Sequence, residues 1–120
     1  MNAARSLKAK LGPEHLKVSG KLTAILGCLT GEEWTGPRMV ELYVTSDGGV
    51  FGRNEDDCGA NAWLGSAEDL TRNLRGVADA VGLTREERIA LISLATPVLH
   101  VHGGAFDLAA CLGVTSLACA

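Results

Sequence analysis

Two helical patterns meet at Gly82, and this junction constrains the fold more than any other feature of the sequence. Upstream of it, apolar residues recur at intervals of four, three and four, which is typical of an amphipathic helix. Ser66 can cap the start of this helix, and Gly82 stands where a helix-ending glycine belongs. A Thr-x-x-Glu capping box beginning at Thr84 then starts a new helix. We therefore predict two helices, Ser66–Val81 and Thr84–Ala95, joined by a very short turn.

A β-hairpin is the second clear element. Aliphatic and polar residues alternate over Val40–Thr45, a second run follows at Val50–Asn54, and Asp47-Gly48 lies between them. A two-residue Asp-Gly turn suits a tight hairpin because both central positions need positive φ. This turn predicts that Val44 pairs with Phe51 and that the two share one face of the sheet.

Two periods compete in the segment Leu16–Cys28. Its even positions are mainly apolar and its odd positions from 17 to 23 are polar, which is typical of a half-buried strand. Leu22, Ile25, Leu26 and Leu29 also have the spacing of a helix. We favour the strand, and the helix stays open as the alternative for the second half.

Shorter patterns complete the chain. Ala3–Leu11 has helical spacing and is followed by glycine and proline, Val98–His102 has a strand-like composition, and Ala105–Leu112 is weakly helical. We predict an α+β fold: a small antiparallel sheet of three strands, with Val98–His102 open as a fourth, and the helix pair packed on one face. At 120 residues the chain has the length of one domain, so we expect residues 1–120 to form a single α+β domain.

Cysteine usage and the N-terminal residues indicate the compartment. The four cysteines form no C-x-x-C pair, and no apolar signal-peptide core precedes the helices. We expect reduced thiols and a cytoplasmic location. Leu108–Ala120 is uncharged but shorter than the roughly 20 residues that a membrane-spanning helix needs, so we expect no membrane association.

The charge distribution bears on the partners. All four lysines and Arg5 lie in the first 21 residues, and the rest of the chain is acidic, giving a net charge of −3. Leucines interrupt the basic residues, so we interpret them as a solvated helix face and do not expect nucleic acid as a partner. The apolar tail and the scarcity of charge after Glu87 suggest uncovered apolar surface, and we expect a homodimer.

Two groups of residues are candidates for binding. The polar connection Asn54–Leu64 joins the hairpin to the first long helix and contains an acidic run that could contact a protein partner. The run consists of Glu55, Asp56 and Asp57. Aromatic residues are scarce at 4%, and a pocket that gathered them would be a ligand site. These ligand-binding candidates are Trp34, Tyr43, Phe51 and Trp63.

The pair His100-x-His102 suggests a transition-metal site. With His15, Asp107 or Cys111 it could complete a zinc or copper site, yet the paired spacings of established zinc motifs are missing. The segment Pro97–Phe106 also resembles the His-Gly-Gly oxyanion loop of lipases and esterases, but no Gly-x-Ser-x-Gly nucleophile motif follows it. We therefore assign no metal site, no catalytic residue and no cofactor.

Three functions follow from these features. The leading hypothesis is a binding or regulatory module that acts through a protein partner. The first alternative is a small-ligand-binding domain with an aromatic-lined pocket. The second is a small metal-dependent or hydrolytic enzyme that uses the His-x-His segment.

Overall fold

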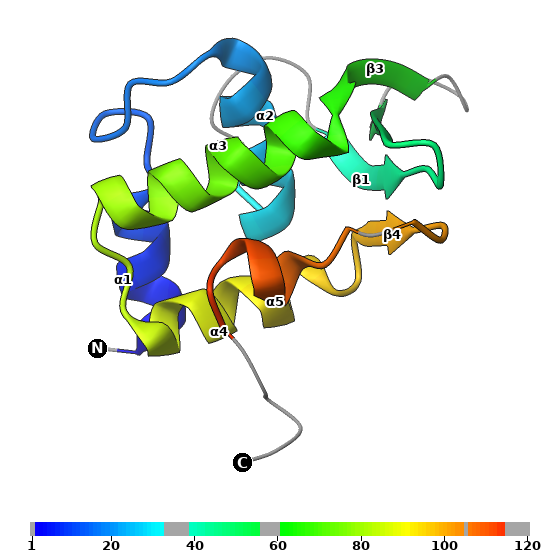
Figure 1. Cartoon of the computed structure of the whole chain (residues 1–120). Coiled ribbons are helices and arrows are strands. Elements are labelled where there is room, and N and C mark those ends of the chain that lie inside the picture. Colours follow the sequence, from blue (N-terminus) through cyan, green and yellow to red (C-terminus); the bar gives the residue numbers. More distant parts are fainter. Residues whose placement is uncertain (1, 33–38, 56–60, 105, 115–120) are drawn as a thin grey trace.

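The computed structural model describes residues 2–32, 39–55, 61–104 and 106–114, and its fold is α+β, as predicted (Figure 1). In chain order the elements are α1 (Ala3–Lys10), α2 (Gly20–Thr30), β1 (Met39–Val44), β2 (Gly49–Asn54), β3 (Asn61–Ser66), α3 (Ala67–Ala80), α4 (Arg85–Ala95), β4 (Leu99–Val101) and α5 (Leu108–Cys111). None of the helices within these ranges has the length and apolar character needed to cross a membrane.

The four strands form one sheet in the order β3-β2-β1-β4. Neighbours β3, β2 and β1 are antiparallel, whereas β4 runs parallel to β1. The possible fourth strand at Val98–His102 is thus present as β4. The prediction of a purely antiparallel sheet is wrong at this edge, because β4 is parallel to β1. A parallel neighbour needs a long crossover, which the two helices α3 and α4 provide between the hairpin meander and β4.

The predicted strand Leu16–Cys28 is wrong, because this segment contains the helix α2. Ser19 caps the helix by accepting from the backbone N–H of Leu22, and Gly31 ends it with a φ of 76°. The helical spacing that begins at Leu22 therefore decides the structure. The polar residues at alternate positions gave the pattern of a strand, but one of them, Ser19, is polar because it caps the helix.

The third strand is β3, which lies partly in the predicted polar connection Asn54–Leu64. This strand contains Asn, Ala and Gly, which have low strand propensity, so local sequence does not predict it. It forms by pairing with β2, and the pairing shifts by one residue between Val50 and Phe51. Leu64 is the additional residue in this bulge.

The hairpin register differs by one residue from the prediction. Val44 pairs with Val50 and Tyr43 pairs with Phe51, so the predicted pairing of Val44 with Phe51 is wrong. Because paired residues point to the same side of a sheet, Val44 and Val50 share the inner face. Phe51 instead shares the outer face with Tyr43.

The turn explains this shift. The N–H of Thr45 donates to the carbonyl of Gly49 over 2.9 Å, which leaves three residues between the paired ends rather than two. Gly48 is the last of them and has a φ of 92°, a conformation that glycine adopts at no steric cost. The Asp-Gly signal was correct for the place of the turn and wrong for its length.

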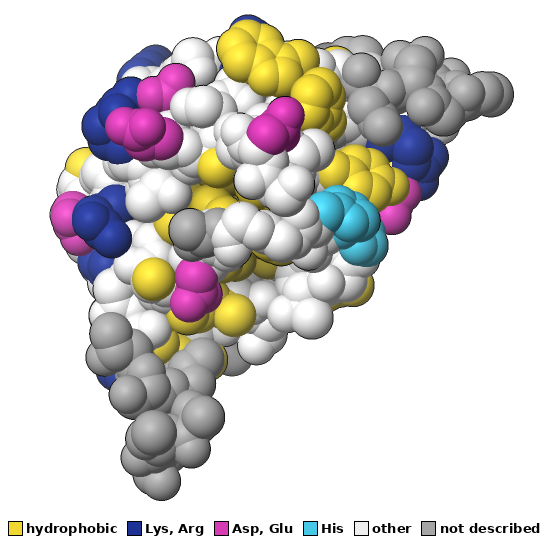
Figure 2. All heavy atoms as spheres, turned by 45° about the vertical axis from the view of Figure 1, so that its right-hand side comes forward, with side chains coloured by type: hydrophobic (Ala, Val, Ile, Leu, Met, Phe, Trp, Pro, Cys, Tyr) yellow, Lys and Arg dark blue, Asp and Glu magenta, His cyan; other side chains and the backbone are white. Residues whose placement is uncertain are grey.

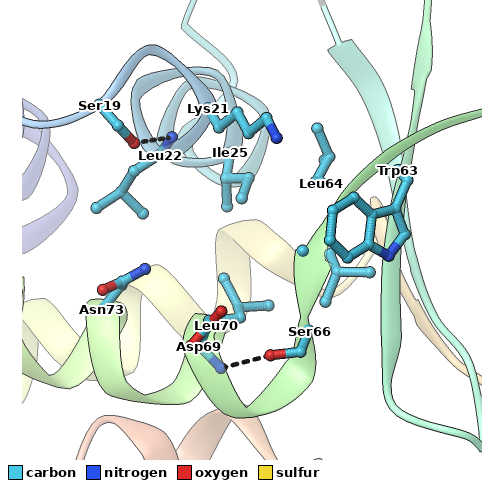
Figure 3. A pocket seen from close by; sticks show the side chains of 12 residues that line it. Ser19, Lys21, Leu22, Ile25, Trp63, Leu64, Ser66, Asp69, Leu70 and Asn73 are labelled. Carbon is cyan, nitrogen blue, oxygen red and sulfur yellow. Dashed lines mark hydrogen bonds between the residues drawn. The ribbon is translucent and has the colours of Figure 1, made fainter.

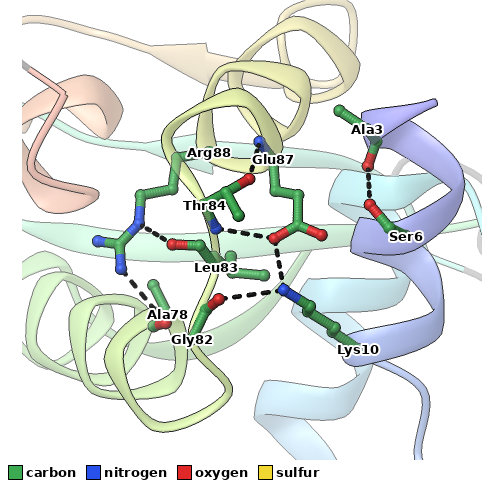
Figure 4. Close-up of polar contacts among 9 residues, drawn as sticks. All are labelled: Ala3, Ser6, Lys10, Ala78, Gly82, Leu83, Thr84, Glu87 and Arg88. Atoms are coloured by element: carbon green, nitrogen blue, oxygen red, sulfur yellow. Dashed lines mark hydrogen bonds and ion pairs between the residues drawn. The ribbon is translucent and has the colours of Figure 1, made fainter. Parts of the chain in front are cut away.

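The helix caps agree with the sequence. Ser66 accepts from the N–H of Asp69, and Thr84 and Glu87 form the full capping box (Figure 4). Gly82 has a φ of 68°, and the N–H of Leu83 donates to the carbonyl of Ala78 over 3.0 Å, which ends α3. These interactions join residues at most five apart, so local sequence suffices to predict them.

Two helices, α2 and α3, pack on one face of the sheet, whereas the predicted packing of α4 on the sheet is not observed among the described residues (Figure 1). α2 packs against β1, α3 packs against β2 and β3, and α4 lies against α1 and α2. α2 thus lies between the sheet and α4, a position that the prediction of only two helices on the sheet did not include. The inner face of the sheet is closely packed: Leu42, Val44 and Val50 are at most 1% exposed. Gly52 lies beneath Met39 and Leu64 and leaves space for both side chains.

Candidate interaction surface and adjoining pocket

The outer face of the sheet carries a group of aromatic and charged side chains, which we call the sheet-face cluster. Side chains alternate along a strand, so residues next to the buried Leu42, Val44 and Val50 point away from the helices. Strand pairing then brings positions from β2, β1 and β4 into one group. The cluster consists of Glu41, Tyr43, Phe51, Arg53, His100 and His102.

Glu41 is the centre of the polar contacts in this cluster. Its Oε1 accepts from Arg53 Nε over 2.8 Å and lies 2.6 Å from Arg53 Nη2. The Tyr43 hydroxyl donates to the same oxygen over 3.1 Å, and His100 Nε2 lies 2.9 Å from Oε2. The carboxylate therefore joins side chains from three strands.

The acid and base in the cluster stabilise each other's charged forms. The hydrogen bond from Arg53, followed by that from Tyr43, holds the pKa of Glu41 below its usual value, although partial desolvation opposes this. The hydrogen bond to Glu41 in turn raises the pKa of Arg53. The Arg53 and Glu41 side chains are 34% and 27% exposed, so the pair is accessible to a partner rather than enclosed.

Ring stacking orders the other half of the cluster. The Tyr43 ring lies with its centroid 5.1 Å from that of His100 and 6.0 Å from that of His102, with interplanar angles of 25° and 21°. The N–H of His102 also donates to the carbonyl of Val44 over 2.8 Å, which fixes the backbone beyond β4. In Figure 2, histidine side chains lie beside hydrophobic, basic and acidic ones on this side of the molecule.

Two further aromatic residues extend the surface toward β3. The Phe51 ring lies over Gly49, where an added Cβ would come within 2.9 Å of it. Trp63 occupies the position on β3 that pairs with Phe51, and 59% of it is exposed. Lys21 from α2 places its ammonium 5.5 Å from the Trp63 ring.

The ligand-binding candidates from the sequence lie as follows. Tyr43, Phe51 and Trp63 occupy directly paired positions on three neighbouring strands. They form a row across the sheet rather than the lining of one enclosed cavity. Trp34 lies outside the described residues.

The acidic candidates and the histidines are also placed. Glu55 is exposed directly after β2, while Asp56 and Asp57 lie outside the described residues. His100 and His102 contact Tyr43 and Glu41, and no group of three His, Cys, Asp or Glu side chains with metal-binding geometry occurs in the described part of the chain. Cys111 is buried, and burial raises the pKa of its thiol, which donates to the Thr71 hydroxyl.

A pocket of about 250 Å³ opens between the first turns of α2 and α3, beside β3 (Figure 3). Apolar side chains form its floor, and polar side chains line its rim. The floor consists of Leu22, Ile25, Val50, Leu64 and Leu70, and the rim includes Ser19, Lys21, Ser66, Asp69 and Asn73, with Trp63 at one side. We call it the α2–α3 pocket.

Comparison of the chain with protein-family models, with curated proteins and with solved structures gives no match. The site is therefore interpreted from its own residues.

Sequence reasoning missed Glu41 and Arg53 as members of a site. In the structure the two residues form an ion pair between β2 and β1. The alternation of Val40–Thr45 indicates that Glu41 and Tyr43 share a face, so two of the six members of the cluster were accessible from sequence. The contribution of His100 depends on the parallel pairing of β4 with β1, for which no local signal exists.

Proposed function

We propose that this chain is a protein-binding module and that its binding surface is the sheet-face cluster. The observation that supports the proposal is the row of Trp63, Phe51, Tyr43 and His100 at paired positions across all four strands. The chain has only five aromatic residues, and three of them stand at paired positions, Tyr43 and Phe51 half-buried on the outer face and Trp63 on the edge strand beside Lys21 of α2. Aromatic side chains and arginine are the residue types that dominate binding energy at protein interfaces.

The polar contacts support the same proposal. Tyr43, Arg53 and His100 are held by Glu41 before any partner arrives, so little side-chain entropy remains to be lost on binding. An aromatic surface with a preorganised acid–base pair at its edge fits a protein partner that offers apolar side chains and matching polar groups.

A second copy of the chain is one such partner, and we retain the homodimer as a proposal. Glu41 and Arg53 present both signs of charge on one surface, which suits the self-complementary contacts of a two-fold interface. The cytoplasm is the compartment that we propose, since a buried Cys111 thiol held by Thr71 agrees with reduced cysteines.

Site-specific photocrosslinking in cells tests the proposal. A photoreactive phenylalanine analogue replaces Phe51 in one variant and, as the matched control, the exposed Arg85 on α4 in another. We expect a discrete crosslinked band from position 51 and none from position 85. The mass of the band distinguishes a second copy of the chain from a different protein.

A further variant links the band to the cluster. Tyr43→Ala removes the ring at the centre of the row, and we expect it to abolish the crosslink from position 51 while the thermal unfolding temperature shows that the domain stays folded. No discrete band from position 51, or equal bands from positions 51 and 85, would refute the proposed surface.

A further inference from the structure

The α2–α3 pocket is a second site, which lies between the helices and the sheet and shares only Trp63 with the aromatic row. Its floor is formed by apolar residues from four elements, α2, α3, β2 and β3, and these floor residues are largely buried. The volume of about 250 Å³ is below the roughly 300–1,000 Å³ of typical small-molecule sites, so the occupant is small. Five aliphatic side chains on the floor require that most of the occupant be apolar.

The rim of the pocket carries one cation, Lys21, and one anion, Asp69. Lys21 contacts the Trp63 ring and forms no ion pair with any residue that the structure describes, whereas Asp69 is paired with Arg72. A lysine ammonium stacked on an indole at the mouth of an apolar pocket is available to an anion that brings its own apolar body.

The two helices that flank the pocket add partial positive charge to its rim. Ser19 and Ser66 cap α2 and α3, and both serines line the pocket, so the positive ends of two helix dipoles are at its rim. The first amides of a helix have no partner within the helix, and each serine satisfies one of them. The first turn of α2 therefore offers further N–H donors beside Lys21.

We propose that the α2–α3 pocket binds a small organic carboxylate with a short aliphatic or aromatic body. The carboxylate contacts the Lys21 ammonium and the first turn of α2. The apolar body lies against Leu22 and Leu70, and the exposed Trp63 ring covers it (Figure 3).

Tryptophan fluorescence provides the direct measurement. The chain has two tryptophans, so a Trp34→Phe variant leaves Trp63 as the single reporter. Hexanoate and phenylacetate are the probes, and hexanamide and hexylammonium are matched compounds without the negative charge. We expect a saturable change in Trp63 fluorescence with the two carboxylates. Hexanamide and hexylammonium should bind at least about tenfold more weakly than hexanoate, because they lack the charge-assisted contact.

Two substitutions locate the site. Lys21→Gln should weaken hexanoate binding by about five- to tenfold, whereas Lys17→Gln, which removes the same charge from an exposed position outside the pocket, should leave it unchanged. Asn73→Phe places a ring at the exposed rim and should abolish binding without unfolding the domain.

Measurement of NMR chemical shifts on the unsubstituted chain provides an independent test that needs no variant. Addition of hexanoate should move the signals of Lys21, Leu22 and Leu70 and the indole N–H of Trp63, with those of α4 unchanged. The proposal is overturned if neither carboxylate saturates, if hexylammonium binds as well as hexanoate, or if Lys21→Gln behaves like Lys17→Gln.

Discussion

The Lys10 ammonium lies 2.7 Å from the Glu87 carboxylate, although the two residues are 77 positions apart in the chain (Figure 4). Lys10 also donates to the carbonyl of Gly82 over 3.0 Å, and Glu87 accepts from the N–H of Thr84 over 2.7 Å. A capping residue that serves the start of α4 therefore also ties the end of α1 to the turn after α3. Glu87 is only 3% exposed, so its contact with Lys10 is a buried polar link between the end of α1, the end of α3 and the start of α4.

Glu87→Gln should destabilise the fold. Glutamine keeps an oxygen for the Thr84 N–H but loses the charge that Lys10 meets, and we expect the free energy of unfolding to fall by about 1–2 kcal/mol. Glu86→Gln is the control, because the exposed Glu86 is the neighbouring acidic residue in the first turn of α4 and lacks the ion pair with Lys10. Urea unfolding of both variants measures the difference. Equal losses in the two would mean that the helix dipole, not Lys10, gives Glu87 its effect.

The same carboxylate should make stability depend on pH in the acid range. Burial raises the pKa of Glu87, but the polar contacts with Lys10, Ser6 and the Thr84 N–H outweigh burial and bring the pKa to about 2, below the ordinary 4.5. The unfolded chain thus binds this proton before the folded chain does, and stability present above pH 4.5 is lost as pH falls toward 2.

Urea midpoints of the parent chain and Glu87→Gln between pH 7 and pH 3 measure this effect. The variant should lose less stability over that interval, because one titrating carboxyl is gone. The slope that remains belongs to other carboxylates with lowered pKa values, Glu41 among them. Parallel curves for the two proteins would contradict the assignment to Glu87.

Gly52 and Gly76 should respond to alanine in opposite directions. A Cβ on Gly52 would come within 2.7 Å of Met39 Cε and 2.9 Å of Leu64 Cδ1, and we expect Gly52→Ala to cost about 1–3 kcal/mol through overpacking. Gly76 lies within α3 with open space around its Cα, so Gly76→Ala should stabilise the fold by about 0.5–1 kcal/mol. Thermal unfolding compares the two.

A second substitution tests the cause of the Gly52 effect. Met39→Ala opens the space that the new methyl group would enter, so Gly52→Ala should cost less in that background than in the parent chain. A cost that is the same in both backgrounds would show that backbone strain, and not Met39, is responsible.

The parts of the fold that sequence could predict are those fixed by near neighbours. The caps at Ser66 and Thr84 and the left-handed glycine at 82 each satisfy backbone groups within a few residues. The same local logic favoured the wrong structure for Leu16–Cys28, where both periods were present in the sequence. Burial decided for the helix, because seven residues of α2 are buried in the core.

The sheet and its outer surface depended on distant partners. β3 contains residues with low strand propensity and forms against β2, and β4 reaches β1 only after the two long helices have crossed over. Tyr43 and Phe51 were named as binding candidates for a pocket. The register change that puts the Phe51 ring on the outer face beside Tyr43 results from one extra residue in the turn, a difference that the Asp-Gly signal does not specify.

Arg88 should hold α5 in place. Its Nε donates to the carbonyl of Leu83 over 3.0 Å and its Nη1 to that of Leu112 over 2.9 Å, so one guanidinium joins the α3–α4 turn to the end of α5. Arg88→Met keeps the aliphatic stem and leaves these carbonyls without their donor. We expect a loss of about 1.5–3 kcal/mol in the free energy of unfolding, and little change for Arg85→Met at an exposed position of the same helix.

Hydrogen exchange separates this local role from general destabilisation. If Arg88 fixes α5, the amides of Cys111 and Leu112 should exchange faster in Arg88→Met than its global loss of stability explains, because α5 can then open by itself. Those amides donate to the carbonyls of Asp107 and Leu108 in the parent structure. Exchange that rises equally in α5 and in α3 would show that Arg88 stabilises the core as a whole and has no specific role at α5.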